Sequence, residues 1–312
     1  MDKTLKIAVL MGGPGSEREV SLASGNAVVE ALTNEGLDAV AVDINSRSIE
    51  LPDGTGLCFN TIHGTFGEDG EMQTLLEAMD MPYTGAGINS SRVGFDKCAS
   101  KKVFVEHGVP TPASEIIDCA GGIVFPNMPL PYVVKPPREG SSVGISVAHT
   151  QEEAEQAITE AAKFSNDILI EQFVEGKELT VAILDNEALP VVHIVPPADG
   201  SFYDMATKYP WMNDSDDAPT VGSEYFCPAD LDPETTANIQ AAALAAHKSL
   251  GIEIYSRVDV LLDADNNPYV LEANTIPGMT ATSLLPKAAQ AAGLEFGPLC
   301  KKIAALSLAH RA

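Results

Sequence analysis

A strand–turn–strand segment near the C-terminus constrains the fold of this chain more than any other feature. Two runs rich in strand-forming residues, 258–262 and 269–271, flank the sequence D-A-D-N-N-P at residues 263–268. Aspartate, asparagine and proline are typical of turns, whereas β-branched and other apolar residues are typical of strands. The segment therefore predicts an antiparallel hairpin whose turn is centred on Asp265 and Asn266.

The predicted register brings four polar side chains to one face of the hairpin. With that turn centre, Asp259 lies opposite Glu272, and Arg257 lies opposite Asn274. Side chains alternate between the two faces of a strand, so all four share one face. The apolar residues predicted to point the other way are Val258, Val260 and Leu271.

This face has the chemistry of a divalent-cation site. Two carboxylates and an amide oxygen suit a hard cation such as Mg²⁺. A magnesium ion beside a fixed guanidinium is what phosphoryl transfer needs, because both neutralise charge on the transferring oxygens. An exposed hairpin face with an ordinary cross-strand charge pair is the alternative, and the segment alone does not separate the two interpretations.

Length and charge limit the classes of protein and partner. A chain of 312 residues suits two or three domains. Its 44 acidic and 19 basic residues give a net charge of −25, so nucleic acids and anionic membranes are poor partners. An anionic ligand must instead be met by a few focused lysines, arginines, backbone amides and metal ions.

The cysteines and the N-terminal sequence indicate a cytoplasmic protein. Five scattered cysteines without a C-x-x-C motif are typical of reduced thiols, not of a disulfide framework or a zinc site. The apolar run at residues 7–11 is too short for a signal-peptide core or a membrane span. We expect it to form a buried first strand.

The N-terminal third alternates strand and helix patterns. Strands are predicted at residues 7–11, 38–42 and 56–62, and helices from Ser16 to about Glu35 and over 70–81. Ser16 and Glu19 form an S-x-x-E capping box. Such alternation predicts an α/β unit with a parallel sheet and ligands at the carboxyl ends of its strands.

The remainder is an α+β pattern in which strands dominate. After a helix at 96–107, strands are predicted at 132–135, 143–147, 167–172, 179–184 and 188–195, with helices at 152–163 and 234–250. A long irregular stretch at 198–222 is typical of a functional lid or a disordered segment. Two helices are expected after the hairpin.

Two further segments suit a nucleotide. A strand ending in Lys135 runs into a loop with Gly140, Ser141 and Ser142, whose small residues allow backbone N–H groups to approach phosphate oxygens. The G-K-[ST] order of a Walker loop is absent, and a plain hairpin with a glycine turn is the alternative. Downstream, an apolar strand ends in acidic residues and an aromatic one. Its end could bind adenine through backbone groups and ribose through a carboxylate, and a sheet strand with a charged turn is the alternative. Its residues are Glu171, Gln172, Phe173, Val174 and Glu178.

Two residues of the N-terminal third are candidates for a substrate site. Glu17 opens the first helix, where an acid also complements the helix dipole for structural reasons alone. His63 follows an apolar strand, at the carboxyl end where α/β sheets bind ligands, although single histidines are often structural.

Ten segments together carry a resemblance to a known family. They are G-G-P-G-S-E-R-E-V-S (12–21), H-G-T-F-G-E-D-G (63–70), P-Y-T-G-A-G (82–87), D-K (96–97), V-K-P-P-R-E-G-S-S-V-G (134–144), I-E-Q-F-V-E-G-K-E-L-T-V (170–181), F-Y-D-M-A-T-K-Y (202–209), E-Y-F-C-P-A (224–229), R-V-D-V (257–260) and E-A-N-T-I-P-G-M-T (272–280). In content and order they resemble the D-alanine–D-alanine ligases of the ATP-grasp superfamily.

The resemblance implies an ATP-grasp fold preceded by a Rossmann-like N-terminal domain. The implied domains are 1–95, N-terminal and Rossmann-like; 96–185, central and ATP-binding; and 186–312, C-terminal and catalytic. The implied reaction joins two D-alanines through an acyl phosphate made with ATP, for peptidoglycan synthesis. The implied protein is a cytoplasmic homodimer.

The resemblance also implies a role for each site residue. ATP would contact Lys97, Lys135, Ser142, Glu171, Gln172, Phe173, Val174, Glu178 and Lys208. Two Mg²⁺ (or Mn²⁺) ions would be bound by Asp259, Glu272 and Asn274. The catalytic set would be Glu17, Ser141, Ser283, Arg257, Gly278 and Tyr209, with His63 and Leu284 binding substrate.

Departures from the family pattern and alternative activities remain. Pro137 stands where a small residue is usual, Gln172 replaces a common lysine, and residues 211–222 lengthen the lid. A D-alanine–D-lactate ligase or another ATP-grasp carboxylate–amine ligase is the nearest alternative, and Tyr209 favours the dipeptide. A non-catalytic nucleotide-binding protein would be expected to lack the metal ligands or the glycine-serine loop, and both are present.

Overall fold

The N-terminal third folds around a three-stranded parallel sheet, as the alternating pattern predicts. The computed structural model describes residues 4–140, 143–196 and 223–311. The sheet has the order β2-β1-β3, and both pairings are parallel. Its elements are β1 (Lys6–Gly12), α1 (Arg18–Asn34), β2 (Asp38–Ile44), β3 (Thr55–Asn60), α2 (Glu71–Ala78) and α3 (Ile88–Phe95).

The predicted capping box at the start of α1 is wrong. The helix begins at Arg18, its N-cap residue is Glu17, and no side chain caps it. The turn after β1 therefore extends one residue further than the motif implies, and the Ser21 N–H donates to the Glu17 carbonyl oxygen at 3.0 Å. This start places Glu17 directly before the helix, where it lines the site described below.

An antiparallel sheet of order β4-β7-β5-β6 forms the second unit. Its elements are β4 (Ser114–Asp118), β5 (Tyr132–Lys135), β6 (Ser146–Ala148), α5 (Gln151–Ala161) and β7 (Asp167–Gln172). The strands at 132–135 and 167–172 are confirmed. The one predicted at 143–147 is displaced to β6, because Gly144 has φ +70°, which no strand residue adopts.

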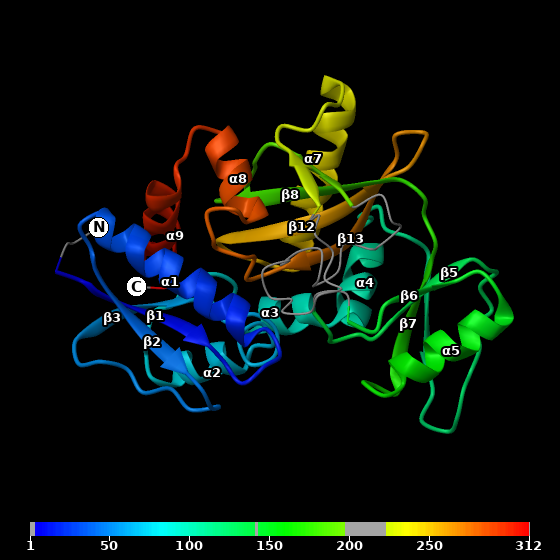
Figure 1. Ribbon diagram of the computed structural model, residues 1–312, viewed down its shortest axis with the longest axis horizontal. Helices are drawn as coiled ribbons and strands as arrows, with labels where there is room; N and C mark the ends of the chain where they lie inside the picture. The colour runs from blue at the N-terminus through cyan, green and yellow to red at the C-terminus, as the bar shows by residue number, and fades with distance from the viewer. Residues whose placement is uncertain (1–3, 141–142, 197–222, 312) are drawn as a thin grey trace, which may run out of the picture.

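The third sheet, of six strands, is the largest (Figure 1). Its path is β11-β10-β8-β12-β13, with β9 beside β8. Its strands are β8 (Lys177–Leu184), β9 (Glu187–Ala188), β10 (Val192–Val195), β11 (Glu224–Phe226), β12 (Tyr255–Leu262) and β13 (Pro268–Asn274). The associated helices are α4 (Lys97–Glu106), α7 (Pro233–Ser249), α8 (Leu284–Ala291) and α9 (Phe296–Arg311).

The hairpin register predicted from the sequence is confirmed where the polar residues lie. Arg257 pairs with Asn274, and Asp259 pairs with Glu272. The register then shifts by one residue, so that Val260 faces Val270 and Leu271 is an extra residue in β13.

The bulge corrects one predicted side-chain direction. Val270 is fully buried in the core, whereas Leu271 is half-buried and lines a cavity. The turn formers predict the hairpin but not a bulge beyond it. The prediction that Leu271 points away from the polar face is therefore wrong, because it lines the same cavity as Asp259 and Glu272. Val258 and Val260 do point into the core.

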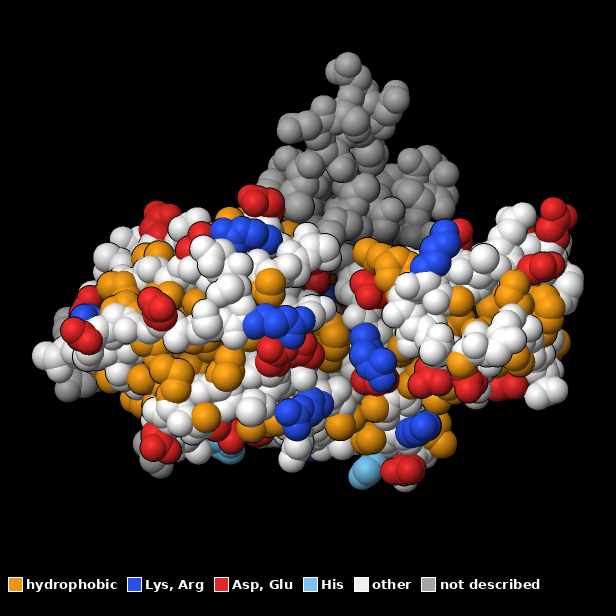
Figure 2. Space-filling model, turned by 90° about the horizontal axis from the view of Figure 1, so that it is seen from below, with side chains coloured by type: hydrophobic (Ala, Val, Ile, Leu, Met, Phe, Trp, Pro, Cys, Tyr) orange, Lys and Arg blue, Asp and Glu red, His pale blue; other side chains and the backbone are white. Residues whose placement is uncertain are grey.

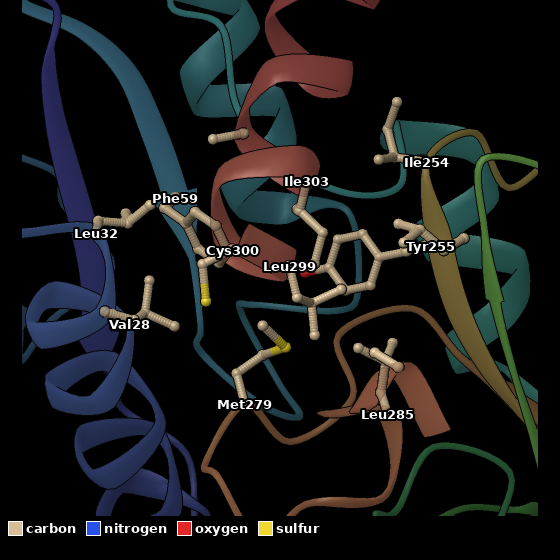
Figure 3. Close-up of a cluster of buried hydrophobic side chains, with 14 of the residues drawn as sticks. Val28, Leu32, Phe59, Ile254, Tyr255, Met279, Leu285, Leu299, Cys300 and Ile303 are labelled. Atoms are coloured by element: carbon tan, nitrogen blue, oxygen red, sulfur yellow. The ribbon is translucent and has the colours of Figure 1, made fainter. Parts of the chain in front are cut away.

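The first and third sheets share one hydrophobic core, whereas the second sheet has its own. Figure 3 shows Val28, Leu32 and Phe59 of the N-terminal unit facing Leu299 and Ile303 of α9. The core of the second sheet is made by residues of β4 to β7 and α5. The three-domain division stays a prediction, and the pairing of β8 with β12 argues for a second boundary just before Lys177.

The described surface has two properties relevant to partners. On the face in Figure 2, basic side chains are separated from one another and interspersed with acidic ones. In the part of the chain that the structure describes, no helix has the length and apolar character needed to cross a membrane.

We predict that Leu299→Ala destabilises the protein by about 2–5 kcal/mol, because the truncation leaves a cavity in the shared core. Leu299 is fully buried, whereas Val105 is 65% exposed. Val105→Ala is therefore the control, with a change below about 0.5 kcal/mol. Urea unfolding measures both variants, and equal effects would contradict a core that joins the first and third sheets.

Candidate active site

The carboxylate of Asp259 is held by side chains from three adjacent strands. Arg257 donates to it from Nε and Nη2, at 2.9 and 2.8 Å. Asn274 Nδ2 donates to Oδ2 at 3.1 Å, and the Thr180 hydroxyl donates to Oδ1 at 2.7 Å. The Arg257 and Asp259 side chains are only 13% and 17% exposed, so this is not an exposed charge pair.

Glu272 pairs with a lysine that arrives from α4. Lys97 Nζ lies 3.1 Å from Glu272 Oε2 and donates to the Glu139 carbonyl oxygen at 2.8 Å. Burial acts to lower the pKa of Lys97, but the nearby carboxylates, Glu272 foremost among them, together outweigh burial and the pKa is raised. Lys97 therefore stays cationic at neutral pH.

The donor set of this face fits a hard divalent cation. In the described parts of the chain, no group of three histidine, cysteine or acidic side chains has the arrangement of a metal site. Here two carboxylates, Asp259 and Glu272, are joined by the amide of Asn274, and oxygen ligands of this kind suit Mg²⁺. Arg257 pairs with Asp259, and Lys97 pairs with Glu272. The acids of this face therefore already interact with positive charge, which is also what a bound cation would supply.

A cavity of about 390 Å³ lies between the second and third sheets. Its rim and floor contain the predicted nucleotide residues that the structure describes: Lys97, Lys135, Glu171, Gln172, Phe173, Val174 and Glu178. Apolar side chains form its walls: Val133, Ile145, Val147, Leu179, Ile194, Leu261 and Leu271. An apolar slot with a cationic end suits a purine carrying phosphates.

A second cavity, of about 60 Å³, adjoins the first at the hairpin face. It is lined by Glu17, His63, Glu68, Arg257, Asn274, Gly278 and others, and Lys97 and Glu272 line both cavities. The small cavity is therefore in contact with the cationic end of the large one.

Two glycines make room for the Glu17 carboxylate. A Cβ on Gly64 or on Gly140 would lie 2.6 or 2.7 Å from Glu17 Oε2, which is closer than real Cβ contacts. Gly140 belongs to the predicted phosphate loop, and Gly64 follows β3. Glu17 is thus enclosed by segments from two different units.

His63 holds the segment that carries Gly278. Its Nδ1 lies 2.8 Å from the Ile276 carbonyl oxygen, and its Nε2 lies 3.2 Å from Ser24 Oγ. The Met279 N–H donates to the same Ser24 Oγ at 3.3 Å. Since a carbonyl only accepts, Nδ1 carries the proton and Nε2 accepts from the serine hydroxyl.

Both ring nitrogens of His63 are therefore used by the protein itself. Burial lowers the pKa of His63, against the opposing charge of Glu17, so the ring is neutral. The ring lines the small cavity, and its hydrogen bonds give it a positioning role. Direct substrate contact by His63 stays a prediction.

Glu68 and Thr180 are site residues that the sequence analysis missed. Glu68 lines the small cavity and accepts from the Gly64 N–H at 2.8 Å. Burial and the nearby Glu17 raise its pKa to about 8, so it is mostly protonated at neutral pH. Glu68 could have been found from the sequence, because it follows the carboxyl end of the same strand as His63. Thr180 could not, because its contact with Asp259 depends on the pairing of β8 with β12, which was not predicted.

The remaining predicted residues are not among those that line the two cavities, or lie outside the described residues. Ser283 is the N-cap residue of α8, and its hydroxyl bonds to the Thr280 N–H at 3.1 Å. The Leu284 side chain is buried in the shared core, which leaves only its backbone for a ligand. Ser141, Ser142, Lys208 and Tyr209 lie outside the described residues.

Two sheets enclosing a nucleotide-sized slot, with lysines and acidic ligands at one end, define an ATP-grasp protein. Two family models match: "D-ala D-ala ligase C-terminus" over residues 122–305 and "D-ala D-ala ligase N-terminus" over residues 46–86. The chain belongs to the D-alanine–D-alanine ligase family.

Individual relatives match along almost the whole chain. The D-alanine–D-alanine ligases of Methylacidiphilum infernorum and Bordetella petrii are 45% and 42% identical over 302 and 306 residues. These alignments cover 96% of this chain and 95% and 90% of the relatives. The Bacillus anthracis D-alanine–D-alanine ligase complexed with ATP has a TM-score of 0.85 at 30% identity, covering 98% of both chains. The predicted fold class and family are confirmed.

We predict that His63 is neutral and protonated on Nδ1 at pH 7. Two-bond ¹H–¹⁵N NMR correlations of the ring, assigned with His63→Gln, measure the tautomer directly. Because burial lowers its pKa, charging should begin only below the ordinary value of 6.5. An Nε2–H tautomer, or titration above that value, would contradict the hydrogen bonds to Ile276 and Ser24.

Proposed function

We propose that this protein joins two D-alanines into D-alanyl-D-alanine with conversion of ATP to ADP and phosphate. The observation that supports this most is the shared wall of the two cavities, formed by Lys97 and Glu272. A phosphate donor in the large cavity and a carboxylate acceptor in the small one would meet there. The ATP complex of the Bacillus anthracis relative supports the nucleotide assignment.

The large cavity is proposed to hold ATP. Lys97 and Lys135 would meet its phosphates, together with Ser142 and neighbouring amides, and Lys208 would join them. Gln172 and Val174 would offer backbone groups to adenine. Phe173 would pack near the base and Glu178 would bind the ribose. Glu171 faces this cavity, but both of its oxygens are paired with lysines, so we assign it to positioning.

Asp259, Glu272 and Asn274 would hold two Mg²⁺ or Mn²⁺ ions. Bound there, the metal supplies positive charge against the phosphate oxygens. Arg257 and Lys97 supply charge from the protein itself, and both are fixed by pairing with the two acids. The chain thus holds its cations in place before the substrate arrives, which avoids reorganisation during the reaction.

The small cavity is proposed to hold the first D-alanine. About 60 Å³ admits only a small side chain, and Glu17 supplies a carboxylate for the substrate ammonium. A carboxylate oxygen of this D-alanine attacks the γ-phosphorus, and ADP leaves, giving an acyl phosphate. The protonated Glu68 carries no charge that would oppose the incoming carboxylate.

The second D-alanine then completes the peptide bond. Its amine attacks the acyl carbon, phosphate leaves, and the nitrogen loses a proton. Arg257 and the Gly278 amide would stabilise the tetrahedral oxyanion. Ser283 and the Leu284 amide would bind the second carboxylate. Ser141, Tyr209 and Glu17 would form the hydrogen-bond network that excludes water, which would otherwise hydrolyse the acyl phosphate.

The cellular setting follows from the family. We propose a homodimer in the cytoplasm that supplies the dipeptide for peptidoglycan. We also propose three domains, 1–95, 96–176 and 177–312. The second boundary replaces the one expected at 185/186, because β8 pairs with β12.

We predict that phosphate release from ATP and Mg²⁺ requires D-alanine and that L-alanine is inactive. A coupled phosphate assay measures this, and chromatography identifies the dipeptide. Supplying D-alanine with D-lactate tests the alternative activity. Equal formation of dipeptide and depsipeptide at neutral pH would contradict the dipeptide assignment.

We predict that Asp259→Asn lowers kcat by about 100-fold or more, since losing a charged metal ligand costs about 3 kcal/mol of transition-state stabilisation. The Mg²⁺ concentration for half-maximal activity should rise as well. Asp265→Asn is the matched control, because Asp265 is an exposed acid in the turn of the same hairpin. Near-normal activity and Mg²⁺ dependence of Asp259→Asn would overturn the metal assignment.

A further inference from the structure

Three charged side chains are buried together behind the large cavity. Lys101 Nζ lies 2.5 Å from Glu171 Oε1, and Lys135 Nζ lies 2.5 Å from Glu171 Oε2. The side chains of Lys101, Glu171 and Lys135 are 4%, 2% and 10% exposed. Lys135 and Glu171 line the cavity, whereas Lys101 is not among its lining residues.

Burial lowers the pKa of Lys101 below its ordinary value of 10.5, although its ion pair with Glu171 opposes that shift. With both lysines protonated, the cluster carries one positive charge more than the neutral pair of Glu171 and Lys135. Burying an unbalanced charge is costly, so a protein that only needed stability would be expected to omit it. An anionic ligand in the adjoining cavity would balance the charge.

Both lysines keep Glu171 ionised. Burial acts to raise the pKa of Glu171, but Lys135 and Lys101 outweigh burial and the pKa is lowered. The two ion pairs restrain the carboxylate at both oxygens, so Lys101 helps to set the position from which Glu171 holds Lys135.

Lys101 also connects the two sheets that enclose the cavity. Its Nζ donates to Thr111 Oγ1 at 2.5 Å, and Thr111 Oγ1 donates to the Val270 carbonyl oxygen at 2.7 Å. Val270 belongs to β13 of the third sheet, and Glu171 belongs to β7 of the second. In Figure 1, α4, which carries Lys101, lies between these sheets.

We infer that Lys101 is a positioning residue for the nucleotide: it holds Glu171, and through it Lys135, while its contact with Thr111 fixes the second sheet against the third. This rests on the proposed function, because it assigns Lys101 to the nucleotide site of that reaction. Without Lys101, Glu171 and Lys135 form a neutral pair, and the end of the cavity loses one positive charge.

The test is calorimetric binding of ATP and Mg²⁺ in the absence of D-alanine. Lys101→Met keeps the length of the side chain but removes its charge, and should raise the Kd for ATP by about tenfold or more. Lys102→Met is the matched control, since Lys102 is the exposed neighbour on the same helix, and its Kd should change less than about twofold. The KM for D-alanine should stay within about twofold for both variants.

Action through Glu171 is tested by a double-mutant cycle. In a Glu171→Gln background, the added effect of Lys101→Met on the Kd should largely disappear. A full additional effect, or a lower melting temperature with an unchanged Kd for ATP, would overturn the inference.

A second, milder variant tests the same link if Lys101→Met does not fold. Thr111→Val removes only the hydroxyl and should raise the Kd for ATP by about threefold, whereas an unchanged Kd would refute the link between the sheets. If the unaltered protein itself does not bind ATP, the proposed function fails, and that outcome is separate from the Lys101 result.

Discussion

The pairing of β12 with both β8 and β13 is the constraint on which the site depends. It brings Thr180 and Asn274, from the two strands that flank β12, to the Asp259 carboxylate and places Glu272 beside it. The bulge at Leu271 lets the same hairpin supply polar groups to the small cavity and an apolar wall to the large one. The register of the β12–β13 hairpin therefore sets the positions of the proposed metal ligands Asp259 and Glu272, of the Arg257 guanidinium, and of one wall of the large cavity.

A strongly acidic chain can bind an anion here because its cations are concentrated at one place. Lys97, Lys135 and Arg257 each pair with a buried or half-buried acid, and these ion pairs hold the three cations in place. The net charge of −25 describes the surface, which argues against polyanionic partners. An anionic ligand at the junction of the cavities would therefore meet these fixed cations directly.

The sequence predicted the parts of the fold and site that depend on residues close together in the chain. Turn formers and alternation gave the hairpin partners Asp259 and Glu272, and helix periodicity gave most helices. The S-x-x-E motif failed because the turn after β1 runs one residue further, which no local preference specifies. Glu68, Thr180 and Lys101 were missed because their roles arise from contacts between segments far apart in the chain.

The division of cores explains why the two cavities are built differently. The small cavity lies where the first and third sheets meet, and these share one core, so Ser24 and His63 can hold the 276–279 segment rigidly. The large cavity lies between the third sheet and the second, whose cores are separate. Its width is therefore not set by continuous packing but by side chains that bridge the gap. A single buried lysine at that bridge can then influence nucleotide binding while leaving the small-substrate pocket unchanged.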